Sequence, residues 1–128
     1  MRIDHIAIWA ENIELLRSFY IKYFGMVSND KYVNSNRGFS SYFLSFEGEN
    51  SRIELMNIPG MDSPVGRRNM KGLAHLAISV GGKDAVNALT ERLRGDGYVI
   101  LSEPRTTGDG YYESAVADPE GNYVEIVG

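Results

Sequence analysis

The chain has 128 residues, 43% hydrophobic and 23% charged, a balance typical of one compact globular unit. The formal net charge is −4 and there is no basic block, which argues against nucleic acid and anionic membranes as partners. The absence of cysteine excludes disulfides and thiolate chemistry, and the lack of a signal sequence or long apolar run predicts a cytoplasmic protein that does not enter a membrane.

The first half of the chain predicts one strand, one helix and three further strands. The helix is expected to begin after Asn12, a typical N-cap residue, and to end at Gly25. Its apolar stripe consists of Ile13, Leu16, Tyr20, Tyr23 and Phe24. The predicted strands cover residues 2–10, 26–33 and 39–46 and a short stretch around 53–55, with a turn at 34–38.

The second half repeats this order of elements. Its predicted strands cover residues 75–80, 98–101, 111–117 and 123–127. A helix is expected over 84–94, with Val86, Leu89 and Leu93 inward and Gly95 or Gly97 at its end. Each half is therefore a β-α-β-β-β module, one over residues 1–58 and the other over 72–128. We predict an α+β protein in which a linker over 59–71 joins the two modules into one compact unit.

Both histidines occupy equivalent places in this repeat, and so do two glutamates. His5 and His75 are 70 residues apart, and Glu54 and Glu125 are 71 apart. Because side chains alternate along a strand, their apolar neighbours can pack on the helices while these four groups face the other way. Two imidazoles and two carboxylates suit Ni²⁺, Co²⁺, Zn²⁺, Mn²⁺ or Fe²⁺. The alternative is a pair of core histidines and a pair of surface glutamates.

Three segments then resemble glyoxalase I and the wider vicinal-oxygen-chelate superfamily, which includes bleomycin resistance and dioxygenase-like proteins. They are His5-Ile6-Ala7-Ile8, residues 19–26 and residues 118–126. The resemblance implies that the two modules form a cupped, incomplete mixed β-barrel around a metal, with the helices on the outside. It also implies metal ligation by His5, Glu54, His75 and Glu125, with Glu125 as the catalytic base and Glu54 as the alternative base.

The function implied is that of a metal-dependent lyase or isomerase of glyoxalase I type, which transfers a proton next to a chelated carbonyl or hydroxyl of a small α-oxygenated substrate. The glutathione-binding arginine pattern of well-known glyoxalases has no clear match here. The related methylmalonyl-CoA epimerases have a carboxylate where this chain has Ser41, and commonly a glutamine in place of Glu54. Acyl-thioester epimerase, fosfomycin-type thiol transferase, ring-cleaving dioxygenase and non-catalytic drug-sequestering protein are the alternatives.

Four further residues are candidates for substrate binding. Trp9 shares its predicted strand face with His5, and Arg52 shares the face of Glu54. Arg37 and Arg67 could bind an anionic group, although a packing role for the tryptophan and a solvated linker for Arg67 are the simpler alternatives. By resemblance a homodimer is expected. The metal site could then lie within one chain or be shared between two chains.

Overall fold

The computed structural model describes residues 2–62 and 71–128. Its contacts divide the chain into two compact units, Met1–Ser63 and Pro64–Gly128. Each unit is described by itself below. The linker predicted over 59–71 includes residues 63–70, which lie outside the described residues.

The helix of the first unit, α1 (Ile13–Phe24), has the ends that the sequence predicts. The side chain of Asn12 accepts a hydrogen bond from the backbone N–H of Leu15 at 3.0 Å, so it satisfies one of the free donors of the first turn. Gly25 ends the helix in the left-handed conformation, with φ of 67°, which a glycine adopts without steric cost.

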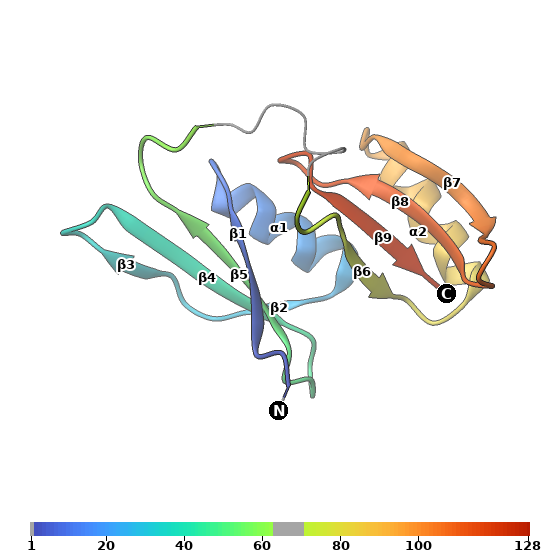
Figure 1. Cartoon of the computed structure of the whole chain (residues 1–128), viewed down its shortest axis with the longest axis horizontal. Helices are drawn as coiled ribbons and strands as arrows, with labels where there is room; N and C mark the ends of the chain where they lie inside the picture. The colour runs from blue at the N-terminus through green and yellow to red at the C-terminus, as the bar shows by residue number, and fades with distance from the viewer. Residues whose placement is uncertain (1, 63–70) are drawn as a thin grey trace. The chain divides into compact units, whose positions relative to one another are not determined.

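The sheet of the first unit is open and mixed. Its strands are β1 (His5–Trp9), β2 (Val27–Ser28), β3 (Tyr32–Asn34), β4 (Phe39–Ser45) and β5 (Arg52–Asn57). The order is β1-β5-β4-β2, with β3 also paired to β4. Strand β1 runs parallel to β5, and the other pairs are antiparallel. Helix α1 packs against β4 and β5, which leaves the opposite face of these strands for the site (Figure 1).

The single strand predicted over 26–33 is wrong, because the structure has two short strands there, β2 and β3. Asn29 lies at the break. Its backbone N–H donates to the carbonyl of Phe43, and its side-chain oxygen accepts from the N–H of Phe43 at 2.7 Å. The side-chain oxygen of Asn29 thus accepts the hydrogen bond from Phe43 that a backbone carbonyl would accept in a continuous strand. The strand is therefore interrupted at Asn29.

The second unit has the same arrangement. Its elements are β6 (Leu76–Ser79), α2 (Lys83–Gly95), β7 (Ile100–Thr106), β8 (Tyr112–Ala117) and β9 (Tyr123–Val127). The strand order is β6-β9-β8-β7, with β6 parallel to β9. The strand predicted over 98–101 is wrong, since β7 begins at Ile100 and continues through Pro104. Because β7 is an edge strand with irregular register, it can contain a proline.

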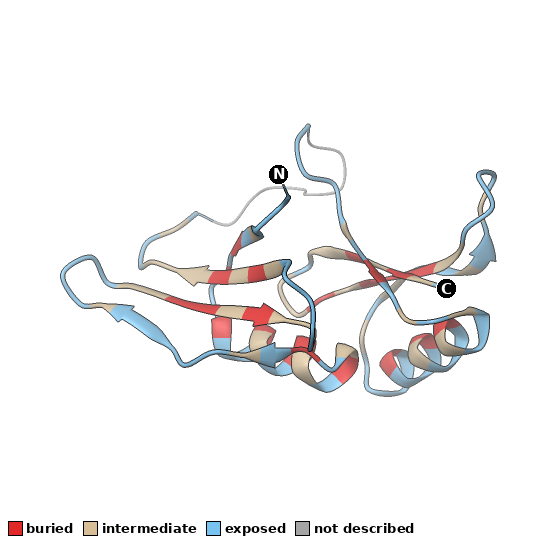
Figure 2. Cartoon of the chain, turned by 90° about the horizontal axis from the view of Figure 1, so that it is seen from below, coloured by how far each residue is buried: buried red, intermediate tan, exposed pale blue. Residues whose placement is uncertain are grey.

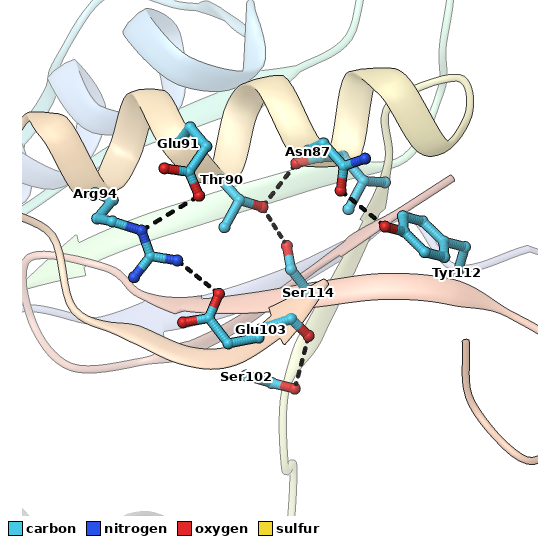
Figure 3. A network of polar contacts seen from close by, with 9 residues as sticks. Asn87, Thr90, Glu91, Arg94, Ser102, Glu103, Tyr112 and Ser114 are labelled. Atoms are coloured by element: carbon cyan, nitrogen blue, oxygen red, sulfur yellow. Dashed lines mark hydrogen bonds and ion pairs between the residues drawn. The ribbon is translucent and has the colours of Figure 1, made fainter. Parts of the chain in front are cut away.

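Each helix buries one stripe against its own sheet (Figure 2). The fully buried apolar side chains of the first unit include Leu16, Phe19, Tyr20, Leu44 and Leu55, and those of the second include Val86, Leu93, Val116, Val124 and Ile126. Phe24 of the predicted apolar stripe and Leu89, predicted to face inward, are half-buried. Phe19 and Thr90 are fully buried beside them. Thr90 is accommodated because its hydroxyl contacts Ser114 of β8 at 2.7 Å (Figure 3).

The α+β class and the two tandem β-α-β-β-β modules are confirmed, with the second strand of the first module split in two. Neither sheet closes into a barrel by itself. No helix of the described residues is both long enough and apolar enough to cross a membrane.

Candidate functional site

The first predicted pair, His5 and Glu54, lies on neighbouring parallel strands of the first unit. His5 is opposite Arg52, and Ala7 is opposite Glu54, so the imidazole and the carboxylate are diagonal neighbours on one face. His5 Nε2 is 3.7 Å from Glu54 Oε2. The residues on either side of Glu54, Ile53 and Leu55, are buried on the opposite face, as strand alternation requires.

The second pair, His75 and Glu125, has the same arrangement in the second unit. His75 directly precedes β6, and Ala77 is opposite Glu125 in the parallel pair of β6 and β9. His75 Nε2 is 3.2 Å from Glu125 Oε2, closer than in the first unit. Val124 and Ile126 are fully buried on the other face. Each module therefore brings its own histidine and glutamate together.

The two glutamates are largely shielded from solvent, whereas the histidines are more open. The side chains of Glu54 and Glu125 are 14% and 18% exposed, and those of His5 and His75 are 39% and 43% exposed. Burial raises the pKa of the Glu125 carboxyl above its ordinary value, and the neighbouring His75 opposes that rise. A carboxyl with a raised pKa is better suited to accept a proton near neutral pH.

A third carboxylate, Glu113, lies on the same face as Glu125 and was not predicted as a site residue. Glu113 on β8 is opposite Val127, two residues beyond Glu125, and its side chain is 16% exposed. Its negative charge contributes to the raised pKa of Glu125. Arg105 of β7 is opposite Glu113, with its guanidinium 3.7 Å from the carboxylate. The register also shows that Glu113 occupies the position that Ser41 has in the first module, a correspondence visible only once the strands are aligned.

The first unit has a different set of neighbours around its pair. Asp4 contacts His5 Nδ1 at 2.9 Å and accepts a hydrogen bond from Arg52. These two hydrogen bonds, that from His5 first, hold the pKa of Asp4 at about 2. The Arg52 guanidinium lies 4.3 Å from the centre of the Phe43 ring, and this ring packs edge-on against His5. Asp4 was missed because its only sequence signal is that it precedes His5.

Two of the remaining predicted substrate residues, Trp9 and Arg37, lie in the described part of the chain and are not gathered at a histidine–glutamate pair. Trp9 lies on β1 with its side chain partly exposed, and its ring packs edge-to-face on Phe39 of β4. Arg37 is in the turn between β3 and β4, beyond the paired ends of both strands. Arg67 lies outside the described residues. Among the predicted substrate residues in the described part of the chain, only Arg52 is adjacent to a predicted metal ligand, and it is already engaged by Asp4 and Phe43.

The donor atoms of the two pairs fit a divalent transition metal. Each pair offers one imidazole nitrogen and one carboxylate oxygen, and the chain has no thiolate to compete. Within residues 2–62 and 71–128, no three or more His, Asp or Glu side chains are grouped so that they could hold an ion. Each pair taken by itself therefore supplies two of the ligands that such a metal requires.

Known proteins resemble the chain over nearly its whole length. A Bacillus subtilis (strain 168) protein, uncharacterized protein YqjT, is 27% identical over 131 residues, which cover 98% of this chain and 97% of the relative. The structure superimposes on that of a V278E mutant of glyoxalase I from Zea mays with a TM-score of 0.79 and 25% identity. The match covers 98% of this chain but only 44% of the maize chain.

Two bacterial structures match over nearly their full length and show the same fold. A glyoxalase family protein from Enterococcus faecalis has a TM-score of 0.79 and 21% identity, covering 99% of this chain and 97% of the other. A glyoxylase/bleomycin resistance protein/dioxygenase domain from Frankia sp. EAN1pec has a TM-score of 0.82 and 16% identity, covering 99% and 96%. The family profile of the Glyoxalase/Bleomycin resistance protein/Dioxygenase superfamily matches residues 2–126. The chain belongs to this superfamily.

Proposed function

We propose that the chain is a metal-dependent lyase or isomerase of glyoxalase I type, acting on a small α-oxygenated substrate. One observation carries the proposal. Each module holds a histidine and a glutamate 3.7 Å or 3.2 Å apart, at repeat-equivalent positions and opposite the apolar face of its sheet. A partly buried carboxylate is costly unless a positive charge compensates it, and a divalent cation bound between the imidazole and the carboxylate would supply that charge.

The proposed ligands are His5, Glu54, His75 and Glu125, which together would bind one divalent cation, such as Ni²⁺, Co²⁺, Zn²⁺, Mn²⁺ or Fe²⁺. Two imidazole nitrogens and two carboxylate oxygens are a donor set that suits such a cation, and they would hold it where the oxygens of a substrate could also reach it. When bound, the cation would act as a Lewis acid that makes the carbon next to a carbonyl more acidic.

The proposed base is Glu125, with Glu54 as the alternative. Burial raises the pKa of Glu125, which favours proton transfer at neutral pH. Ala77 on one side and Ala115 on the other are its direct strand neighbours, and both have small side chains that leave the carboxylate room to move. We propose that this carboxylate takes a proton from substrate carbon and returns it to the neighbouring carbon.

The test begins with metal content. Protein purified without a histidine tag should contain a transition metal, and its melting temperature should rise when Ni²⁺, Co²⁺, Mn²⁺ or Zn²⁺ is added to the stripped form. H5A and H75A should both lose this response. Glyoxalase activity is then assayed with methylglyoxal and a panel of thiols. A stripped protein whose melting temperature ignores all four ions would overturn the proposal.

A second candidate, an acyl-thioester epimerase, is favoured by Glu113. Epimerisation removes a proton from one face of a carbon and returns one to the other, so two proton-transfer groups are useful. Glu113 and Glu125 are two carboxylates on one face of the same sheet. Interconversion of the two epimers of a 2-branched acyl thioester, lost in both E113Q and E125Q, would support this activity. Interconversion that persists in E113Q would count against it.

We also propose that the protein is a homodimer, as its resemblance to glyoxalase I implies. Light scattering coupled to size-exclusion chromatography gives the molar mass directly. A mass twice that of the 14.3 kDa chain is expected, and a monomer at working concentrations would contradict this part of the proposal.

A further inference from the structure

The two histidines are oriented by different neighbours. His5 Nδ1 is 2.9 Å from Asp4 Oδ1, and the Arg52 guanidinium donates to that same oxygen. Arg52 is directly opposite His5 in the β1–β5 pair. Its guanidinium stacks on Phe43, whose ring in turn packs edge-on against the imidazole with centroids 5.3 Å apart. Asp4, Arg52 and Phe43 thus form a closed ring of contacts with His5.

The contact with Asp4 decides which nitrogen of His5 carries the hydrogen. An ionised carboxylate is only an acceptor, so a hydrogen bond to it requires a hydrogen on His5 Nδ1. In the neutral imidazole, Nε2 then carries a lone pair. That nitrogen faces Glu54 Oε2 at 3.7 Å, a separation longer than a hydrogen bond. The lone pair of His5 Nε2 and the carboxylate of Glu54 therefore face each other without a proton between them.

The second module has no counterpart of this arrangement at the equivalent positions. Ala74 precedes His75 and has no side-chain acceptor, and Tyr123 stands where the first module has Arg52. The Tyr123 ring lies 5.9 Å from that of His75. His75 Nε2 is 3.2 Å from Glu125 Oε2, an ion-pair contact. At the position equivalent to Asp4, no carboxylate determines which nitrogen of His75 carries the hydrogen.

We propose that Asp4 and Arg52 are positioning residues that fix His5 with Nδ1 protonated and Nε2 ready to donate its lone pair to a cation. The inference rests on the metal-binding function proposed above, and it assigns Arg52 to the first metal ligand rather than to substrate. His5 is pre-organised for metal, whereas Ala74, at the position equivalent to Asp4, offers His75 no side-chain acceptor. The two histidines are therefore held differently, each within its own module.

Long-range ¹H–¹⁵N correlation spectra of the metal-stripped, ¹⁵N-labelled protein at about pH 8 test the protonation pattern directly, since most imidazoles are neutral there. His5 should show a protonated Nδ1 and a bare Nε2. D4A should shift His5 toward the Nε2-protonated form, and D4N, which keeps an acceptor oxygen, should restore part of the original pattern. The His75 signals should be unchanged in both variants and serve as an internal control. A bare Nδ1 on His5, or identical His5 signals in D4A, would overturn the proposal.

Calorimetric titration of the stripped protein with Ni²⁺ or Co²⁺ provides the second readout. D4A should bind about tenfold more weakly, at the low end for a residue that orients a metal ligand. E103A is the matched control, because it also removes an exposed acid paired with an arginine, Arg94, away from His5. Equal affinity in D4A and wild type would contradict the positioning role. If wild type binds no metal, the proposed function fails, whereas the spectra of the stripped protein still decide the inference about His5.

Discussion

Ala77 and Glu125 lie directly opposite each other across the parallel strands β6 and β9. Ala77 is exposed, and its methyl group is the neighbour of the Glu125 carboxylate on β6. We predict that A77I folds at least as stably as wild type, because a β-branched residue suits a strand. Its affinity for metal should fall on the order of tenfold, or about 1.4 kcal/mol, because the larger side chain crowds Glu125. Calorimetry with Ni²⁺ measures the affinity. S79I, one position further along the same strand face, is the control, and equal losses in both variants would contradict the prediction.

The second prediction separates metal binding from catalysis at Glu125. E125Q keeps the shape of the side chain and an oxygen donor but removes the basic carboxylate, so turnover should fall by about 10²–10⁴. H75A removes a metal ligand outright, so it should lose more metal than E125Q. Elemental analysis and a turnover assay on the same samples give both quantities. Full activity in E125Q would transfer the role of base to Glu54.

The sequence was sufficient where a feature depends on near neighbours. The helix ends at Asn12 and Gly25 follow from a side-chain acceptor and a left-handed glycine, and both are local properties. The pairing of each histidine with its glutamate could be predicted as well, because a repeat fixes which strands are equivalent. Strand alternation then placed the polar groups opposite the buried face.

What the sequence could not predict depends on strand register and on tertiary contacts. Glu113 comes beside Glu125 through the register of β8 with β9, in which Glu113 is opposite Val127, and that register was not assigned from the sequence. Asp4 gains its role from Arg52, which is 48 residues away in the chain. The polar residue at position 90 was not expected in the core, because its burial depends on a hydroxyl of another strand. Tertiary hydrogen bonds of this kind override local preference.

A third prediction concerns pH and the contact between α1 and β4. Glu14 of α1 accepts hydrogen bonds from Lys31 and from Tyr42 of β4, and the bond from Lys31 is the main reason that its pKa is lowered. A lowered folded-state pKa adds stability that is present above the unfolded value and is lost as pH falls through the folded value. E14Q should therefore lower the free energy of unfolding at pH 7, by no more than about 1 kcal/mol because the pair of Glu14 and Lys31 is exposed. The difference in stability between E14Q and wild type should disappear as pH falls below about 4.

Urea unfolding of E14Q and wild type at several pH values measures this difference. K31Q removes the other partner and is the control, and the double variant E14Q/K31Q should be no less stable than either single variant, since both changes delete the same interaction. A destabilisation by E14Q that stays constant down to pH 3 would show that the charge of Glu14 is not its cause.

The last prediction follows from the direction of the buried hydrogen bonds between α2 and β8. The Thr90 hydroxyl donates to the Val86 carbonyl at 2.7 Å, and because it has only one hydrogen, Ser114 must donate to Thr90 (Figure 3). T90V leaves the Ser114 hydroxyl buried without an acceptor and should cost about 1–3 kcal/mol. S114A removes only the donor and leaves Thr90 bonded to Val86, so it should cost less. T90V/S114A should be more stable than T90V, because no polar group remains unpaired. Urea unfolding followed by circular dichroism gives the three values, and a cost for S114A greater than that for T90V would reverse the assigned direction.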